Sequence, residues 1–129
     1  MTSDPRSIAL AYVDACGRKD LDTVASLLAP ELEFVGVSRT VRGAEPYLAV
    51  LRNLGPIWVR SDVERVFTDG DEVCVLYDLV TDTPAGAVPC VEWLRVEGGR
   101  IRWSKLLFDR VGFQPAKEEL ERRAARAAG

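Results

Sequence analysis

The stretches RVFTDGDEVCVLYDLV at residues 65–80 and VEWLRVEGGRIRWSKLLFD at residues 91–109 decide the fold of this chain. Apolar and polar side chains alternate along both stretches, and this period of two is typical of β-strands. Turn-forming residues interrupt the pattern at 69–70, 84–86 and 98–99. The pattern predicts an antiparallel meander of four strands, over residues 57–67, 73–81, 88–96 and 101–109.

The residues before these strands have helical periodicity instead. Asp4 followed by Pro5 is a typical helix start, because a carboxylate caps the first turn and proline fits the first helical position. Asp20 begins a second helical pattern, and the Gly55-Pro56 pair ends a third. We expect helices over residues 4–17, 20–30, 43–54 and 115–128, and a short strand over residues 32–37. Three helices on one face of a curved antiparallel sheet, followed by a polar C-terminal helix, make an α+β domain.

The composition limits the function classes. The chain has 129 residues, of which 47% are hydrophobic, so we expect one domain with a sizeable core. The 17 Lys and Arg against 20 Asp and Glu give a net charge of −3, which argues against nucleic-acid binding. Apolar runs are far shorter than the roughly 20 residues that span a bilayer, and the first residues do not resemble a secretion signal. The separated Cys16, Cys74 and Cys90 are typical of reduced thiols, so we expect a cytoplasmic protein.

Histidine is absent from the sequence. Its absence excludes Ser-His-Asp and Cys-His nucleophiles and nearly every transition-metal site. We therefore expect neither a metal nor a cofactor. Proton transfer would fall to Asp, Glu, Tyr, Lys or Cys side chains.

The hairpin between residues 73–81 and 88–96 could carry such chemistry. If Ala85 is the centre of a short turn, Asp78 faces Glu92 on one face of the sheet. Carboxylates about 5 Å apart repel by about 3 kcal/mol in a protein environment, so one of them would keep its proton near neutral pH. A neutral acid beside an ionised one is suited to general acid–base catalysis. A register shift of one residue would instead move these carboxylates to the opposite face, at a solvated edge.

The register of the last strand has two alternatives. A three-residue turn at 97–99 places the even-numbered residues from 102 to 108 on the face of Glu92. A two-residue turn at 98–99 places the odd-numbered residues from 103 to 107 there. In the second case Lys105 could neutralise Glu92, and the carboxyl group would have no reason to hold a proton.

Both faces of the hairpin are largely apolar, so we expect both to be covered. One face would pack on the helices, and the other would meet a partner subunit. The sequence therefore predicts a homodimer through the outer face of the sheet. The expected ligand is a small apolar molecule, and we expect no nucleic acid and no membrane as partners.

The succession of elements resembles the nuclear-transport-factor-2-like superfamily, and within it the SnoaL-like group. Besides the strands, AYVDACGRKDLDTVASLLAPELEFVG at residues 11–36 and VRGAEPYLAVL at residues 41–51 carry the resemblance. It covers residues 6–109, so we expect a SnoaL-like domain over residues 1–112 and a polar C-terminal helix or tail over residues 113–129. The resemblance implies a cone-shaped sheet wrapped over helices, with a pocket inside and often a dimer. The superfamily includes ketosteroid isomerases, polyketide cyclases, limonene-epoxide hydrolases, dehydratases and binding or transport members, so the reaction does not follow from it.

The functional residues of these relatives carry over only in part. The resemblance to ketosteroid isomerases puts Tyr12 at the position of their oxyanion-hole tyrosine and Glu92 at that of their protonated acid. Gly36, however, stands where their general-base aspartate would be. The acid on the last strand of the cyclases and epoxide hydrolases falls at Leu106, which cannot transfer a proton.

Two functions are compatible with these residues. In the first, the chain is a cofactor-independent isomerase, cyclase, hydrolase or hydratase/dehydratase that acts on a small apolar, ring-bearing molecule. Asp78 would be the general base, Glu92 the neutral acid and Tyr12 a hydrogen-bond donor. In the second, the chain is a non-catalytic ligand-binding or dimerisation module. In either case we expect the pocket to be lined by Cys16, Phe34, Tyr47, Leu51, Trp58, Leu76, Cys90, Leu94, Ser104, Leu106 and Phe108.

Overall fold

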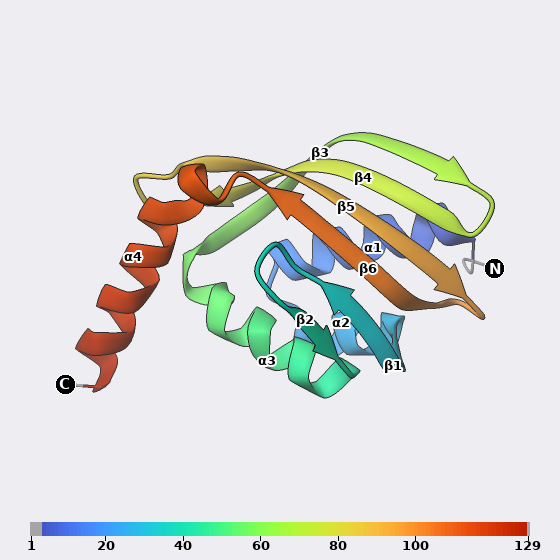
Figure 1. Ribbon diagram of the computed structural model, residues 1–129, viewed down its shortest axis with the longest axis horizontal. Helices are drawn as coiled ribbons and strands as arrows, with labels where there is room; N and C mark the ends of the chain where they lie inside the picture. The colour runs from blue at the N-terminus through green and yellow to red at the C-terminus, as the bar shows by residue number, and fades with distance from the viewer. Residues whose placement is uncertain (1–3, 129) are drawn as a thin grey trace.

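Six strands form one strongly curved sheet in the order β2-β1-β6-β5-β4-β3 (Figure 1). The computed structural model describes residues 4–128. The predicted meander is confirmed, because each of the last four strands pairs antiparallel with the next along the chain. The strands are β1 (Leu28–Val35), β2 (Thr40–Arg42), β3 (Trp58–Asp69), β4 (Glu72–Thr81), β5 (Ala87–Glu97) and β6 (Arg100–Phe108).

Three helices lie against the concave side of this sheet, and a fourth descends from its end (Figure 1). Asp4 and Asp20 cap the first two, since their carboxylates accept hydrogen bonds from Ser7 N and Thr23 N. Gly17 ends the first helix against β3, where a Cβ would overlap the backbone of Ser61. The helices are α1 (Pro5–Gly17), α2 (Leu21–Leu27), α3 (Ala44–Leu54) and α4 (Arg110–Ala128), with a 3-10 turn, η1 (Gly55–Ile57), after α3. The α+β class is therefore confirmed.

Several predicted bounds need correction. The second helix ends at Leu27 and not at Pro30, which lies in β1. Pro30 is tolerated there because the pairing with β6 is irregular between Leu28 and Glu33. The sheet is also not wholly antiparallel, since β1 runs parallel to β6. The last helix begins at Arg110, five residues earlier than expected, because the Asp109 carboxylate accepts a hydrogen bond from Val111 N and caps it.

The register of β4 and β5 differs from the one predicted. Asp78 lies opposite Pro89, and Glu92 lies opposite Val75. The reason is the loop after β4, which is longer than a tight turn at Ala85. Thr81 N and Thr81 Oγ both donate to Gly86 O, at 2.9 and 2.8 Å, and hold this loop closed. The shift moves Asp78 to the face opposite Glu92.

The turn before β6 combines both predicted alternatives. Glu97 pairs with Arg100 across a two-residue turn at 98–99, and both glycines there have positive φ. A register shift between Arg95 and Val96 then adds one residue to β6. As a result, Glu92 lies opposite Leu106, and the even-numbered residues 104–108 share its face. Lys105 lies opposite Trp93, on the outer face, and does not neutralise Glu92.

The core fills the space between the concave face and the helices. Burial alternates strictly along β4, where every odd-numbered residue from Val73 to Thr81 is buried. The same alternation continues on β5 from Val88 to Val96, with even-numbered residues buried. Within residues 4–128, no helix combines the length and the apolar content that crossing a bilayer would need.

Candidate functional site

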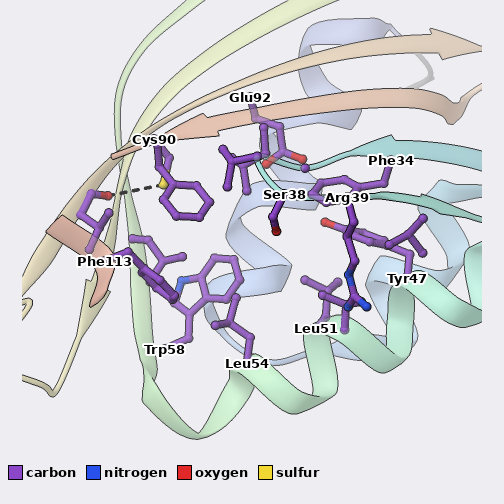
Figure 2. A pocket seen from close by; sticks show the side chains of 18 of the residues that line it. Phe34, Ser38, Arg39, Tyr47, Leu51, Leu54, Trp58, Cys90, Glu92 and Phe113 are labelled. Carbon is purple, nitrogen blue, oxygen red and sulfur yellow. Dashed lines mark hydrogen bonds between the residues drawn. The ribbon is translucent and has the colours of Figure 1, made fainter. Parts of the chain in front are cut away.

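A cavity of about 230 Å³ lies between α3, the β1–β2 loop and the inner face of the sheet (Figure 2). Three elements far apart in sequence meet around it, because α3 forms one wall, β4 to β6 form another, and the start of α4 closes the end. The wall is mostly apolar. Its aliphatic and aromatic residues are Phe34, Val37, Val41, Val50, Leu51, Leu54, Trp58, Leu79, Val88, Leu106, Phe108 and Phe113.

Glu92 lies on the sheet side of this cavity and is only 2% exposed. Three hydroxyl groups donate hydrogen bonds to its carboxyl group. Tyr12 OH and Ser104 Oγ each lie 2.8 Å from Oε2, and Tyr77 OH lies 3.0 Å from Oε1. The hydroxyl of Tyr47 is bonded to that of Tyr12 and extends the network. Throughout residues 4–128, each buried side-chain nitrogen and oxygen has a hydrogen-bond partner.

Burial sets the protonation of this network. Removal from water raises the pKa of Glu92 above its ordinary value of 4.5, although the hydroxyls of Tyr12, Ser104 and Tyr77 oppose the rise. Glu92 takes part in none of the ion pairs formed among residues 4–128. Burial and a negative charge on Glu92 both raise the pKa of Tyr77 as well. Burial therefore favours the neutral form of Glu92, beside neutral phenols.

The protonation state of Glu92 decides whether the phenols present a hydrogen-bond donor or only acceptors to the cavity. If Glu92 were ionised, Tyr77 and Tyr12 would both donate to it, and Tyr47 would donate to Tyr12. The cavity would then meet only oxygen lone pairs. A proton on Oε1 of Glu92 is instead donated to Tyr77, whose own proton becomes free to point into the cavity. A proton on Oε2, given to Tyr12, reverses the Tyr12–Tyr47 bond and frees the proton of Tyr47. Given to Ser104 instead, it frees only the serine hydroxyl.

Asp78 does not belong to this site, so the predicted pair of inward carboxylates is wrong. Its half-buried side chain lies on the outer face, where β3 places Asp62 opposite it. Leu76 is also on the outer face, around a second hollow that Asp78, Pro89 and Leu107 share. Asp78 and Leu76 are therefore removed from the expected site. The raised pKa of Glu92 comes from burial and not from a neighbouring carboxylate.

The structure distributes the other expected site residues between the cavity wall and the layer behind it. Tyr12 and Ser104 contact Glu92 from behind and do not line the cavity, and Cys16 and Leu94 are buried in the core. The expected residues that do line it are Phe34, Tyr47, Leu51, Trp58, Cys90, Glu92, Leu106 and Phe108.

Sequence reasoning missed Tyr77, Arg39 and Phe113. The predicted register puts Asp78 on the face of Glu92, so its neighbour Tyr77 would lie on the opposite face, whereas in the structure Tyr77 lies on the buried face of β4. Phe113 was placed in the polar tail, yet its ring packs 5.2 Å from that of Phe108 and closes the cavity. Arg39 lies in the β1–β2 loop, for which the sequence had no signal of function.

Cys90 offers no nucleophile. Burial raises the pKa of its thiol to about 12, and its Sγ contacts Val88 O at 3.4 Å (Figure 2). The part of the chain that the structure describes also contains no group of three or more His, Cys, Asp or Glu side chains arranged to hold a metal ion.

Comparison with known proteins finds a matching family model and similar solved structures. Residues 9–103 match the family model of the SnoaL-like domain. A protein from Kribbella flavida DSM 17836 has a crystal structure with 30% identity, a TM-score of 0.79 and coverage of 100% of both chains. No curated protein matches the sequence.

Two further solved structures share the fold at lower identity. A candidate ketosteroid isomerase, also from Kribbella flavida, has 21% identity and a TM-score of 0.73, over 84% of this chain and 80% of that chain. A candidate SnoaL-like polyketide cyclase from Jannaschia sp. CCS1 has 20% identity and a TM-score of 0.72, over 85% of this chain and 88% of that chain. At these identities the likeness concerns the fold, and the predicted cone architecture is confirmed.

Proposed function

The chain belongs to the SnoaL-like domain family, and on that premise we propose that it binds a small apolar molecule whose carbonyl oxygen is hydrogen-bonded beside Glu92. The observation that supports this proposal is the contrast between the apolar wall of the cavity and the hydroxyl groups at its sheet side. A pocket of this kind holds a ligand by its apolar body and orients it through a few polar groups.

A carbonyl oxygen fits this end of the cavity better than a hydrogen-bond donor does. When neutral Glu92 donates to Tyr77 or to Tyr12, one phenol proton, of Tyr77 or of Tyr47, is free to point toward the cavity. A ligand oxygen that accepts this proton completes the network. A ligand without such an oxygen would leave the phenol proton unpaired in an apolar wall, which costs free energy.

Catalysis through an enol is the second candidate, in the form of an isomerase, cyclase or hydratase. The neutral acid Glu92 favours it, because a donor aimed at a carbonyl oxygen stabilises the charge that develops there. Such catalysis would also need a general base. Among the described residues that line the cavity, Glu92 is the one carboxyl group, the thiol of Cys90 stays protonated, and the sequence has no histidine. We therefore place ligand binding before catalysis.

Two probes of nearly equal shape test the binding proposal. Acetylnaphthalene has a carbonyl oxygen, and isopropenylnaphthalene has a methylene group in its place. We expect the ketone to bind more tightly by calorimetric titration, and Tyr77→Phe to reduce this preference about fivefold, since one hydrogen bond is lost. Asp78→Asn, on the outer face, is the control and should keep the full preference. Equal affinity of the wild type for both probes would contradict the proposal.

The catalytic candidate has its own test. Deuterium exchange at the carbon next to the ketone of acetylnaphthalene can be followed by NMR in heavy water. Binding alone predicts exchange at the uncatalysed rate. Acceleration by the wild type that Glu92→Gln abolishes would put catalysis first instead.

We also propose that a second copy of the chain covers the outer face of the sheet. Phe67 is 59% exposed and Leu107 is 51% exposed there, and Trp93 is exposed between them. Exposed apolar side chains gathered on one face are typical of an interaction surface.

A further inference from the structure

Two charged residues line the cavity, and they differ in position. Glu92 lies on the sheet side, whereas Arg39 belongs to the loop between β1 and β2 (Figure 2). This loop is a tight turn, because Gly36 N donates to Arg39 O at 2.8 Å. The turn fixes where the Arg39 side chain starts, and the side chain extends toward α3, where Leu51 lies (Figure 2).

Arg39 has no ionic partner within residues 4–128, since none of the ion pairs formed there includes it. Its neighbour Arg42 differs, because its Nη2 lies 3.2 Å from the Glu33 carboxylate. The Arg39 guanidinium is exposed at the cavity and keeps all its donors available. With Glu92 neutral, Arg39 is the one remaining charge on the cavity lining.

From this arrangement we infer that the ligand is a monocarboxylate with an apolar body, whose carboxylate is bound by Arg39 at the cavity mouth. The inference rests on the proposed function and specifies its ligand class. A guanidinium binds a carboxylate through two parallel hydrogen bonds, which also fixes its orientation. One free arginine matches one negative charge, and the neighbouring Arg42 is already occupied by Glu33.

The surroundings of Glu92 and of Arg39 suit different ligand groups. A carboxylate placed beside Glu92 would lose its hydration without gaining a cation, which is expensive. At Arg39 the carboxylate keeps part of its hydration and gains an opposite charge. The carbonyl or other accepting oxygen therefore belongs beside Glu92, and the carboxylate beside the exposed Arg39.

We use 6-acetyl-2-naphthoate and 6-acetyl-2-naphthamide, called naphthoate and naphthamide below. Both carry a ketone oxygen for the sheet side, they have nearly the same shape, and only naphthoate is charged. We expect the wild type to bind naphthoate more tightly than naphthamide in calorimetric titrations at low salt. Arg39→Gln should reduce the affinity for naphthoate about fivefold, an effect in keeping with an exposed ion pair. The affinity for naphthamide should not change, and added salt should weaken only the binding of naphthoate.

Arg52→Gln is the matched control. Arg52 is also exposed and lies on α3, but it does not line the cavity. It should keep the preference for naphthoate. Equal binding of both probes to the wild type, or an equal loss in the two variants, would overturn the carboxylate inference and leave the proposed function standing. Failure of both probes to bind would count against the proposed function and the inference together.

Discussion

Glu92 and Asp78 are carboxylic acids on two neighbouring strands of one sheet, and their surroundings have little in common. Glu92 is 2% exposed and is hydrogen-bonded to three hydroxyl groups. Asp78 is half-buried on the outer face, opposite Pro89 and Asp62. The register of β4 and β5 determines on which face of the sheet each carboxyl group lies. The face then decides whether the group is a neutral hydrogen-bonding group or part of the surface.

The largest expected difference between the two acids concerns stability. Glu92→Ala removes the partner of three buried hydroxyls and leaves a hole, so the free energy of unfolding should fall by about 3 kcal/mol. Asp78→Ala should change it by less than about 0.5 kcal/mol, as is usual at a surface position. Urea unfolding of both variants measures the two values. Similar losses in both variants would contradict the different roles of Glu92 and Asp78.

The outer face gives the next prediction. If a second copy covers this face, Leu107→Glu should weaken dimer association by about 2 kcal/mol, since a charge would be buried against apolar side chains. Val111→Glu is the control, because Val111 is 82% exposed and belongs to α4 and not to a strand of the sheet. Sedimentation equilibrium measures the dimer population. A wild-type protein that is monomeric at every concentration would refute the dimer.

The pH dependence of stability tests whether folding favours the neutral form of Glu92. The pKa of Glu92 is raised in the folded state, so its neutral form is the one that folding favours. Its contribution to stability is complete below the unfolded value of 4.5 and is lost as the pH rises through the higher folded value. Relative to Glu92→Gln, the wild type should therefore lose stability above pH 4.5, by at most about 1.4 kcal/mol per pH unit. Parallel stability curves for the two proteins would contradict this.

Periodicity was sufficient to predict the strands but not their register. The alternation along β4 and β5 placed both strands within one residue of their observed bounds. The partner of Glu92 depended on the loop between them, and that loop is set by hydrogen bonds of Thr81 to Gly86. The periodicity of the sequence does not distinguish between loop conformations of similar free energy.

Long-range pairing also lay beyond the sequence pattern. The parallel pairing of β1 with β6 joins residues about 70 positions apart, as in Phe34 with Ser104. Short segments such as β2, with three residues, are too brief to show a period. The cavity wall was predicted least completely, because its residues Phe113 and Arg39 come from a helix start and a loop, which have no periodic pattern. Glu92 was identified because an acid in an apolar strand is visible locally, whereas Tyr12 was identified through the resemblance to ketosteroid isomerases.

The protonation of Glu92 is the central claim, and carbon-13 NMR of the glutamate side-chain carboxyl groups measures it directly. Comparison of the wild type with Glu92→Gln assigns the resonance. The account predicts one glutamate, missing from the variant, that keeps its proton at pH values above 4.5. A Glu92 resonance that titrates at or below 4.5 would mean an ionised carboxylate inside the cavity and would contradict the account.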